Sequence, residues 1–336
     1  MAVLGSTYLN IADVLKRTGG DDGKVIATVI ELLAETNMIM EDAIVLEGNL
    51  KTGHRTTMRS GLPAVTWRKL YGFTQPSKST TVQVDEACGR MEGYSVIDKQ
   101  LAELGGNGPA LRLSEDEAFL QAMNIEFAST LFYGNSDTAP EEFLGLTPRF
   151  SDPTAENGTQ LVNGGGTGND NTSIWIIKWS ENVCHLIYPQ GSKAGLQHKD
   201  LGEQTETNSS GGKRQVYTTH YTWDVGLALR DFRHIVRICN IDVSNLALAG
   251  EDAYAGANLI NLLVRGLHRM ENLMGGKIVI YANRDAMTAL DLLALNKDNV
   301  YLGQKEFAGT MVTTFRGFPI KLVEAILSTE QAVTGF

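Results

Sequence analysis

The sequence has few of the residues from which metal sites and disulfide frameworks are built. Its three cysteines, Cys88, Cys184 and Cys239, lie far apart and form no CxxC pair. Its six histidines are also dispersed, and none shows HxxxH or HExxH spacing. A structural zinc site needs closely spaced ligands, whereas an odd, scattered set of cysteines is typical of buried, reduced thiols. We therefore expect no metal site and no cofactor.

Long apolar runs are also missing. No apolar stretch approaches the roughly 20 residues that a helix needs to cross a bilayer. The N-terminal stretch "MAVLGSTYLNIADVLKR" lacks the basic-then-apolar order of a secretory signal. We expect no membrane partner, and we interpret this stretch as a short amphipathic helix in an arm. The 336 residues, 43% hydrophobic and 20% charged, suit a folded chain with one large domain or two smaller ones.

Glycines are absent from the position at which they would indicate a nucleotide site. In the stretch 275–293, "GGKIVIYANRDAMTALDLL", a strand runs into a helix, but the glycines precede the strand. A dinucleotide site needs them after the strand, where this sequence has Arg284 and Asp285. We predict instead that Gly275 caps the helix before the strand and that Asn283 caps the helix after it. The unit is then a packing element.

Catalytic signatures are missing too. The stretch "NGGGTGNDN" at 163–171 has no lysine of a phosphate-binding loop and leads into a strand, so we expect a flexible surface loop. The sequence contains no GxSxG elbow, and its many carboxylates show no spacing that would pair two of them across a cleft. We therefore assign no catalytic and no cofactor-binding residue, and we expect a protein that is not an enzyme.

Charge is unevenly distributed along the chain. The net charge is −10, yet residues 48–84 contain six basic residues and neither Asp nor Glu. Subtracting those six positive charges leaves −16 for the rest of the chain. The basic stretch mixes Thr, Val, Trp and Tyr with Gly and Pro, which favours two extended strands in a long loop or hairpin. Three interpretations of its charge remain open: docking on an acidic surface, a solvated face, or direct contact with DNA.

Periodicity and capping signals predict the helices. An amphipathic helix is expected within residues 22–42, in the arm. A capping box, with Ser114 as the N-cap and Glu117 reaching back to it, should begin a long helix that runs to about Tyr133. A further helix is predicted within residues 251–276, before the strand discussed above.

β-rich runs predict the strands. "SIWIIKWS" and "VCHLIYP" are separated by two polar residues and are predicted to form a hairpin. A polar, glycine-rich excursion at about 190–214 and a strand-rich run at 215–243 follow. Two last strands, "GTMVTTF" and "PIKLVEAI", are joined at "RGF".

Several of these segments occur in a familiar order. They are "GLTPRF" (145–150), "SIWIIKWSENVCHLIYPQGSKAGLQHKDLGE" (173–203), "YTWDVGLALRDFRHIVRICNID" (221–242) and a terminal domain ending in "FRGFPIKLVEAI". With the arm, the basic loop and the long helix, the order resembles that of the major capsid proteins of tailed bacteriophages, most of all those of short-tailed phages. The pattern covers nearly the whole chain. The resemblance implies an α+β fold, the tailed-phage major capsid fold.

The resemblance also implies a division of the chain. The expected parts are an N-terminal arm at 1–47, an extended loop at 48–105, a peripheral domain at 106–245 with a spine helix at about 114–134 and an insertion at about 190–214, and an axial domain with a C-terminal segment at 246–336.

The function implied by the resemblance is that of a coat protein. Copies are expected to form pentamers and hexamers of an icosahedral head that encloses double-stranded DNA without sequence-specific binding. The expected location is the virion capsid, after assembly in the bacterial host cytoplasm. Expected partners are a portal, a possible cementing or decoration protein, and a separate scaffolding protein, because this sequence begins almost directly with its arm. Alternatives are the shell protein of an encapsulin-like bacterial nanocompartment and, less in keeping with the missing motifs, an α/β enzyme.

The uneven charge suggests which residues join neighbouring copies. We expect four basic residues of the loop, Arg55, Arg59, Arg68 and Lys69, to lie against acidic surface on an adjacent subunit. The acidic candidates are Glu115, Asp116 and Glu117 at the predicted helix start, or Glu141 and Glu142 beyond its end. Single exposed ion pairs are weak, but the contacts repeat across a closed shell.

Overall fold

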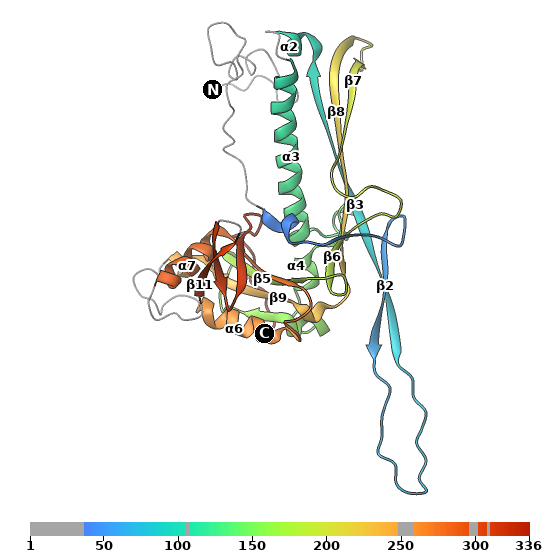
Figure 1. The fold of residues 1–336 in the computed structure, drawn as a ribbon, viewed down its shortest axis with the longest axis vertical. Helices are drawn as coiled ribbons and strands as arrows, with labels where there is room; N and C mark the ends of the chain where they lie inside the picture. The colour runs from blue at the N-terminus through green and yellow to red at the C-terminus, as the bar shows by residue number, and fades with distance from the viewer. Residues whose placement is uncertain (1–36, 105–107, 248–257, 296–301, 308–309) are drawn as a thin grey trace.

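The computed structural model describes residues 37–104, 108–247, 258–295, 302–307 and 310–336. Figure 1 shows three parts along the long axis of the molecule. A compact lobe holds strands β4, β5 and β9–β13 with helices α6 and α7, and a spine lobe holds α2, α3, β7, β8 and residues 88–98 of β3. The third part, residues 53–87, is a two-stranded hairpin that projects away from both lobes. The expected α+β class is confirmed.

The compact lobe is built around one sheet. Its strands are β4 (Leu161–Asn163), β5 (Asn171–Trp179), β9 (Ile235–Asp242), β10 (Lys277–Ala282), β11 (Leu302–Phe307), β12 (Thr310–Phe315) and β13 (Phe318–Leu322). Their order is β11-β12-β13-β10-β5-β9-β4, and β5 runs antiparallel to both of its neighbours β9 and β10. The helices of this lobe are α5 (Val243–Ala247), α6 (Leu259–Arg269) and α7 (Arg284–Leu295).

The apolar run in β5 explains why this strand is central. All nine of its residues are buried, as expected for a strand that is covered on both faces. Because side chains alternate along a strand, Ile174 and Ile176 lie in one hydrophobic cluster with α6 and α7. Trp175, Ile177 and Trp179 point the other way, into a second cluster that includes the C-terminal half of α3. The strand therefore joins the compact lobe to the spine lobe.

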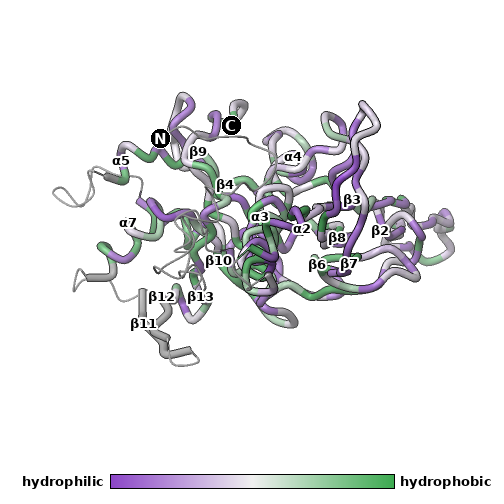
Figure 2. Tube along the Cα trace, turned by 90° about the horizontal axis from the view of Figure 1, so that it is seen from above, coloured by the Kyte–Doolittle hydropathy of each residue, from purple (hydrophilic) through white to green (hydrophobic). Residues whose placement is uncertain are grey.

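The spine lobe is a long helix lying on three strands. Its elements are α2 (Lys99–Glu103), α3 (Gly108–Tyr133), β3 (Thr80–Asp98), β7 (Gln197–Thr207) and β8 (Lys213–Leu229). Phe127 and Leu131 anchor the C-terminal half of α3 in the shared core, whereas the far end has a small cluster of only four buried residues. Figure 2 shows the same contrast, with hydrophobic residues near β10 and hydrophilic ones along β7. No helix among the described residues is long and apolar enough to span a membrane.

Short elements complete the described chain. They are β1 (Val45–Glu47), β2 (Gly53–Gly61), β6 (Cys184–Tyr188), α4 (Leu146–Arg149) and the 3-10 helices η1 (Met38–Glu41), η2 (Glu156–Gln160) and η3 (Phe232–His234). The amphipathic helix predicted within residues 22–42 lies outside the described residues up to residue 36, and its remaining part contains only the short helix η1.

The first described residues are held by a buried carboxylate. Asp42 accepts a hydrogen bond from the Tyr281 hydroxyl at 2.9 Å and lies 2.6 Å from Lys277 Nζ and 2.9 Å from Lys321 Nζ. Ile39 is 1% exposed and belongs to the core shared with α3. The chain that follows the arm is therefore fastened to β10 and β13 before it enters the hairpin.

The long helix begins earlier than its capping signal suggested. It starts at Gly108, so Ser114 and Glu117 lie inside it and do not form a cap. Pro109 stands in the first turn, where its fixed φ suits a helix and its missing N–H costs no hydrogen bond. The predicted end is confirmed, since the helix stops at Tyr133 and the Gly134 N–H bonds back to Thr130.

The predicted hairpin of "SIWIIKWS" and "VCHLIYP" is wrong. β5 pairs with β9 and β10, whereas β6 pairs with β8 and β1, and the two strands meet only at Trp179 and Cys184. The connection between them is bound to the end of β8, because the Val183 carbonyl accepts the Arg230 N–H at 2.7 Å. The two runs pair with different strands, and these long-range partners outweigh the closeness of the runs in sequence.

Predictions around the terminal helices had mixed outcomes. Gly275 does not cap α6, which ends at Arg269; it lies at φ +78° in the turn before β10. The N-cap at Asn283 is confirmed, because its side chain accepts the Ala286 N–H at 2.9 Å. The hairpin at "RGF" is also confirmed, with positive φ at both Arg316 and Gly317, as a two-residue turn of this kind requires.

The sheet of the compact lobe crosses the domain boundary proposed at residues 245 and 246. β5 and β9 precede that boundary, yet β5 is hydrogen-bonded to β10, which follows it. The predicted insertion at 190–214 contains β7 and the first residues of β8, so it forms an edge of the spine sheet. The glycine-rich stretch 163–171 is a loop between β4 and β5, as expected.

A buried ion pair fastens the C-terminal segment to both lobes. Arg237 Nη2 lies 3.0 Å from Glu330 Oε2, and the two side chains are 3% and 5% exposed. The same guanidinium donates to the Phe150 carbonyl at 2.8 Å, and the Tyr133 hydroxyl donates to Glu330 Oε1 at 2.6 Å. Burial, and then the nearby carboxylate, raise the pKa of Tyr133, so this hydroxyl stays a donor at neutral pH.

Glu330→Ala should therefore destabilise the fold strongly. Removing one partner leaves a buried guanidinium without its counter-charge, which typically costs about 3–5 kcal/mol. We expect a fall of that size in the free energy of unfolding, measured by urea denaturation. The control is Lys99→Ala, which breaks the exposed pair with Glu203 and should have little effect. Equal effects of the two substitutions would contradict the role assigned to the buried pair.

Candidate interaction surface

The projecting hairpin is a regular ladder with an unpaired end. β2 and β3 pair antiparallel from Gly53↔Ala87 to Gly61↔Thr80. The connection between them, residues 62–79, contains no strand pairing, and its few bonds include Gly72 N–H to the Lys69 carbonyl at 3.0 Å. We call residues 62–79 the tip. The predicted pair of extended strands in a long hairpin is confirmed.

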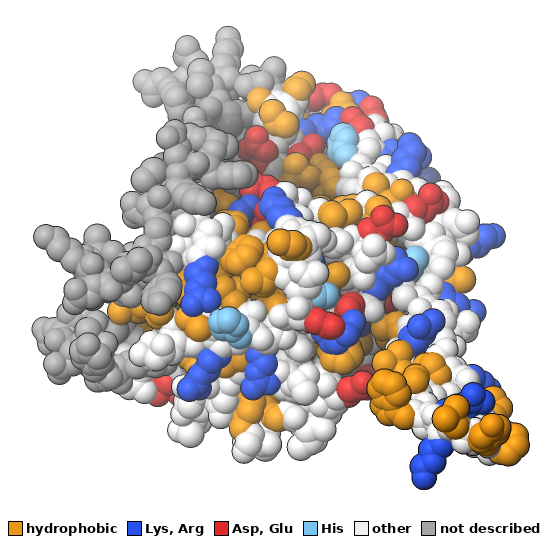
Figure 3. Space-filling model, turned by 60° about the horizontal axis from the view of Figure 1, so that its bottom comes forward, with side chains coloured by type: hydrophobic (Ala, Val, Ile, Leu, Met, Phe, Trp, Pro, Cys, Tyr) orange, Lys and Arg blue, Asp and Glu red, His pale blue; other side chains and the backbone are white. Residues whose placement is uncertain are grey.

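The tip carries a group of exposed apolar side chains. Their exposed fractions range from 81% to 104%, and the residues are Leu62, Val65, Trp67, Leu70, Tyr71 and Phe73. Figure 3 shows them as a projecting hydrophobic group flanked by Lys and Arg side chains. Large contiguous apolar patches are rare on monomeric proteins and mark interaction sites. The tip is therefore the foremost candidate interaction surface of the described chain.

The four basic candidates differ in their surroundings. Arg55 binds Asp85 of the same hairpin through two hydrogen bonds of 2.6 Å, and this pairing lowers the pKa of the Asp85 carboxyl. Arg59, Arg68 and Lys69 are exposed and form no ion pair with another described residue. Arg55 thus has an internal partner one residue beyond the stretch that lacks acids, whereas the other three present free positive charge.

The acidic candidates lie in two places. Glu117 is exposed on α3, and the exposed side chains of Leu113 (62%) and Leu120 (43%) flank it on the same helix face. Asp116 lies beside Tyr221, and burial first, then this nearby carboxylate, raise the pKa of Tyr221. Glu115 also has an interaction within the chain. Of these three, Glu117 is the most accessible.

Glu141 and Glu142 lie beside the root of the hairpin in their own chain. A Cβ at Gly89 of β3 would come within 2.8 Å of the Glu141 carbonyl oxygen, so the two backbones are in direct contact. Glu141 is exposed and Glu142 is half-buried. Neither side chain is close to the tip, since Gly89 already belongs to the part of β3 that pairs with β8.

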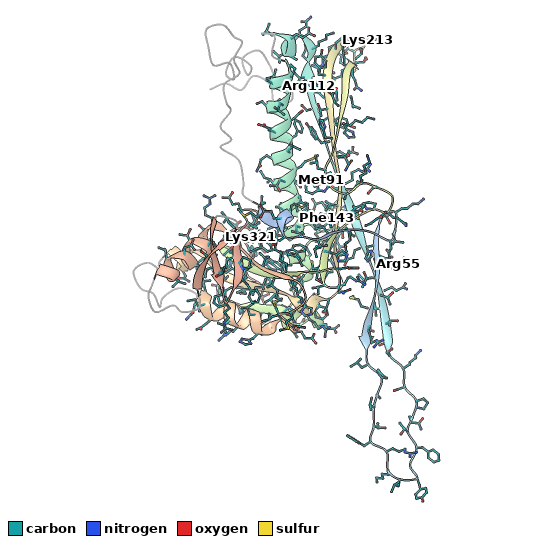
Figure 4. The ribbon with its side chains drawn as sticks, viewed as in Figure 1. Arg55, Met91, Arg112, Phe143, Lys213 and Lys321 are labelled. Carbon is teal, nitrogen blue, oxygen red and sulfur yellow. The ribbon has the colours of Figure 1, made fainter. Side chains whose placement is uncertain are left out.

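Within one chain the tip and the acidic candidates on α3 are far apart. Figure 4 places Arg55 on the hairpin, about halfway along the molecule, and Arg112 near the start of α3, toward the end opposite the tip. The tip lies beyond Arg55, and Glu117 lies little more than one helical turn after Arg112. The two sets cannot meet inside a single chain.

A second set of side chains holds the hairpin root, and sequence reasoning missed it. Arg149 of α4 binds Glu86 of β3 through two hydrogen bonds of 2.6 Å, and both side chains are nearly buried. His54 of β2 meets His185 of β6 with ring centroids 5.9 Å apart. The partners in these two contacts are 63 and 131 residues apart in sequence, so no local spacing could have revealed either pair. The one available signal was Glu86, an acidic residue within a stretch with the pattern of a strand.

The described residues offer little to a metal or a nucleophilic mechanism. No group of three or more His, Cys, Asp or Glu side chains among them could hold a metal ion. Burial raises the pKa of Cys88 and of Cys184 to about 12, so neither thiol is ionised at neutral pH. An open depression beside α2 contains Arg112, which is already bound to Asp200 at 2.7 Å.

Comparisons with known proteins agree with this arrangement. A family model described as major capsid protein GP7 matches residues 20–334. The chain is similar to one in the structure of bacteriophage Epsilon15, with a TM-score of 0.79, 34% identity and 100% of both chains covered. It is also similar to the bacteriophage JBD30 capsid, with a TM-score of 0.48, 12% identity, and 88% of this chain and 93% of that one covered. A third similar structure is the holo-SrpI encapsulin complex from Synechococcus elongatus. Its TM-score is 0.46 and its identity 11%, and the match covers 70% of this chain and 97% of that one. No match was found among curated proteins.

From the exposure of the tip we predict where a protease first cuts the hairpin and the spine lobe. In the unassembled chain, trypsin should cleave after Arg68 or Lys69 well before it cleaves after Arg112, because the tip has no strand pairing whereas Arg112 lies within α3. Mass spectrometry of timed digests measures the two rates. Replacing Arg68, Lys69 and Lys78, the three basic residues of the tip, with Gln should remove the early fragments. Cleavage after Arg112 at an equal or greater rate would contradict the described structure of the tip.

Proposed function

The chain belongs to the family of major capsid protein GP7, and on this premise we propose that its copies join head to tail into the pentamers and hexamers of an icosahedral head around double-stranded DNA. The observation that carries the proposal is the hairpin tip, which exposes apolar and basic side chains that no described part of its own chain covers. A surface of this kind at one end of a molecule needs its complement on a different copy.

The direction of the hairpin favours a head-to-tail contact. A contact between two different patches is heterologous, and it closes into a ring if the rotation between copies permits. The tip and the exposed face of α3 are such patches, because they lie toward opposite ends of the long axis. Rings of five and six copies are the closed solutions that also tile a shell.

The partner surface that we propose for the tip is the exposed face of α3 on a neighbouring copy. Leu113 and Leu120 supply apolar contact there, and Glu117 between them supplies negative charge. From Asp98 to Glu126 the chain has six carboxylates and only two basic residues, Lys99 and Arg112, and both of these are already ion-paired. This face therefore complements the basic, apolar tip in both respects.

Apolar burial would supply most of the free energy of this contact. Each aromatic side chain can bury about 150–250 Å², so the three in the tip can remove roughly 450–750 Å² from water. At about 25 cal/mol per Å² that is on the order of 10–20 kcal/mol before the cost of association is subtracted. Exposed ion pairs contribute little each. Arg59, Arg68 and Lys69 would instead steer the tip toward acidic surface and fix its orientation.

Other partners follow from the same function. A chain with a net charge of −10 has little tendency to hold DNA by its phosphates, which suits a container without sequence-specific binding. We include a portal, a separate scaffolding protein and a possible cementing or decoration protein in the proposal, with assembly in the bacterial host cytoplasm. As a component of the virion capsid the chain has a structural role.

Removing the aromatic anchors of the tip should stop assembly. The double substitution Trp67→Ser with Phe73→Ser takes away two fully exposed side chains, and interface anchors of this type contribute roughly 2–4 kcal/mol each. We expect no closed shells by negative-stain microscopy, with an unchanged urea midpoint because neither residue belongs to a core. The matched control is Met274→Ser, 80% exposed on the compact lobe. Normal shells from the double variant would refute the proposed contact.

Charge reversal tests the partner surface. Arg68→Glu with Lys69→Glu should block shell formation, and adding Glu117→Lys to the same chain should restore part of it, because every copy carries both surfaces. Lys199→Glu with Lys213→Glu on the spine lobe makes the same change of charge at a different place and serves as the control. If the triple variant assembles no better than the double variant, α3 is not the partner of the tip.

A further inference from the structure

The root of the hairpin is the place where β3 changes partners. Up to Ala87 this strand pairs with β2, and from Cys88 onward it pairs with β8. β2 has no second strand beside it in this part of the sheet. Whatever holds β2 against the body therefore decides whether the hairpin keeps a fixed direction.

A pair of histidine side chains adds to the contacts between β2 and the body, which also include two hydrogen bonds between Asn49 and the backbone of Arg55. His54 of β2 lies edge-on to His185 of β6, with ring centroids 5.9 Å apart and an angle of 78° between the rings. His185 is 1% exposed. The Nδ1 atoms of both rings are buried and have no hydrogen-bond partner among the described residues. The contact is thus a packed one between two rings, and no acceptor is placed to receive an added proton on either Nδ1.

The charges around this contact are mostly positive. Arg230, at the end of β8, raises the electrostatic cost of a proton on either ring. Glu86 stands opposite His54 in the β2–β3 ladder, but both of its carboxylate oxygens are bound by Arg149 of α4 at 2.6 Å. One carboxylate therefore faces two guanidinium groups. An imidazolium formed here would be buried beside a net positive charge.

We propose that the pair of His54 and His185 is a pH-dependent contact that fixes the hairpin while both rings are neutral and releases its root when one ring is protonated. This inference concerns the regulation of the hairpin, and it rests on the proposed function only in giving the hairpin a role in assembly. Its physical cause is the geometry of the root, in which the buried ring of His185 meets the half-buried ring of His54 beside Arg230, and neither Nδ1 atom has a hydrogen-bond partner among the described residues.

The direction of the pH effect follows from linkage. Burial first, then His54 and Arg230, lower the pKa of His185 from 6.5 to about 4, and burial lowers the pKa of His54 as well. The open form of the root, with His185 in water, takes up a proton at its ordinary value and is favoured as the pH falls. The contact is fully stable above pH 6.5 and is lost progressively toward pH 4. At pH 5 the opening equilibrium of the root is about 30-fold larger than at neutral pH.

Hydrogen exchange on the full-length, unassembled chain tests this inference. The amides of residues 53–57 should lose protection by about 30-fold between pH 7.5 and pH 5.0, after correction for the intrinsic pH dependence of exchange. His185→Phe keeps an aromatic ring and removes the titrating group, so it should abolish the loss. The matched control is His220→Phe. His220 stacks on Tyr94 in the spine lobe, with ring centroids 4.3 Å apart, and its replacement should leave the loss unchanged.

A second measurement decides the matter if His185→Phe does not fold. Nuclear magnetic resonance titration of the wild-type histidines should give a pKa for His185 far below the ordinary value of a histidine. Protection at residues 53–57 that does not depend on pH, or an ordinary pKa at His185, would overturn the inference. Neither readout involves assembly. The proposed contact between the tip and a neighbouring copy is therefore tested separately, by the tip variants described above.

Discussion

The described lobes of the chain cannot remove the apolar tip of the hairpin from water, and the rest of the structure is organised around that constraint. A two-stranded ladder has two open faces and no core of its own, so it cannot fold the tip back over itself. The tip is also beyond the reach of both lobes, because the hairpin projects away from them. A second copy is the nearest source of complementary surface, which is why a family of shell proteins suits this arrangement better than a monomeric enzyme does.

A projecting hairpin is useful for docking only if its direction is defined, and the fold defines it through β3. This strand is a single run of 19 residues that belongs to the hairpin at one end and to the spine sheet at the other. Arg149 binds Glu86 at the point of change, and Gly89 lets the backbone of residues 141–143 pack directly on the strand. The aromatic residues of β5 then tie the base of α3 to the compact lobe. A force on the tip is thus transmitted to both lobes through continuous backbone and packed side chains, without a flexible linker.

Local signals in the sequence were sufficient for the hairpin, the end of the long helix, the Asn283 cap and the last β-turn, because each depends on residues close together in the chain. They were insufficient where distant partners decide the outcome. β5 and β6 are neighbours in sequence but pair with different strands, since β9, β10 and β8 offer better burial. The interface candidates show the same limit. Charge alone drew attention to Arg55, and only the fold reveals that Asp85 neutralises it. The apolar side chains of the tip were visible in the same stretch, but their exposure depends on the hairpin having nothing to lie on.

The charge of the hairpin has a further consequence for a surface that exposes this much apolar area. Unassembled copies could associate through their tips, because hydrophobic attraction is not selective and would favour any two tips that met. The five basic residues between positions 48 and 84 other than Arg55, with no acidic residue among them, make such an encounter repulsive, whereas the acidic face of α3 attracts the same tip. The apolar side chains then provide the strength of the contact and the basic ones its selectivity, which is the division of roles expected of complementary interfaces. The acidity of the remaining chain contributes to this selectivity, since a neutral or basic body would offer the tip no preferred place to bind.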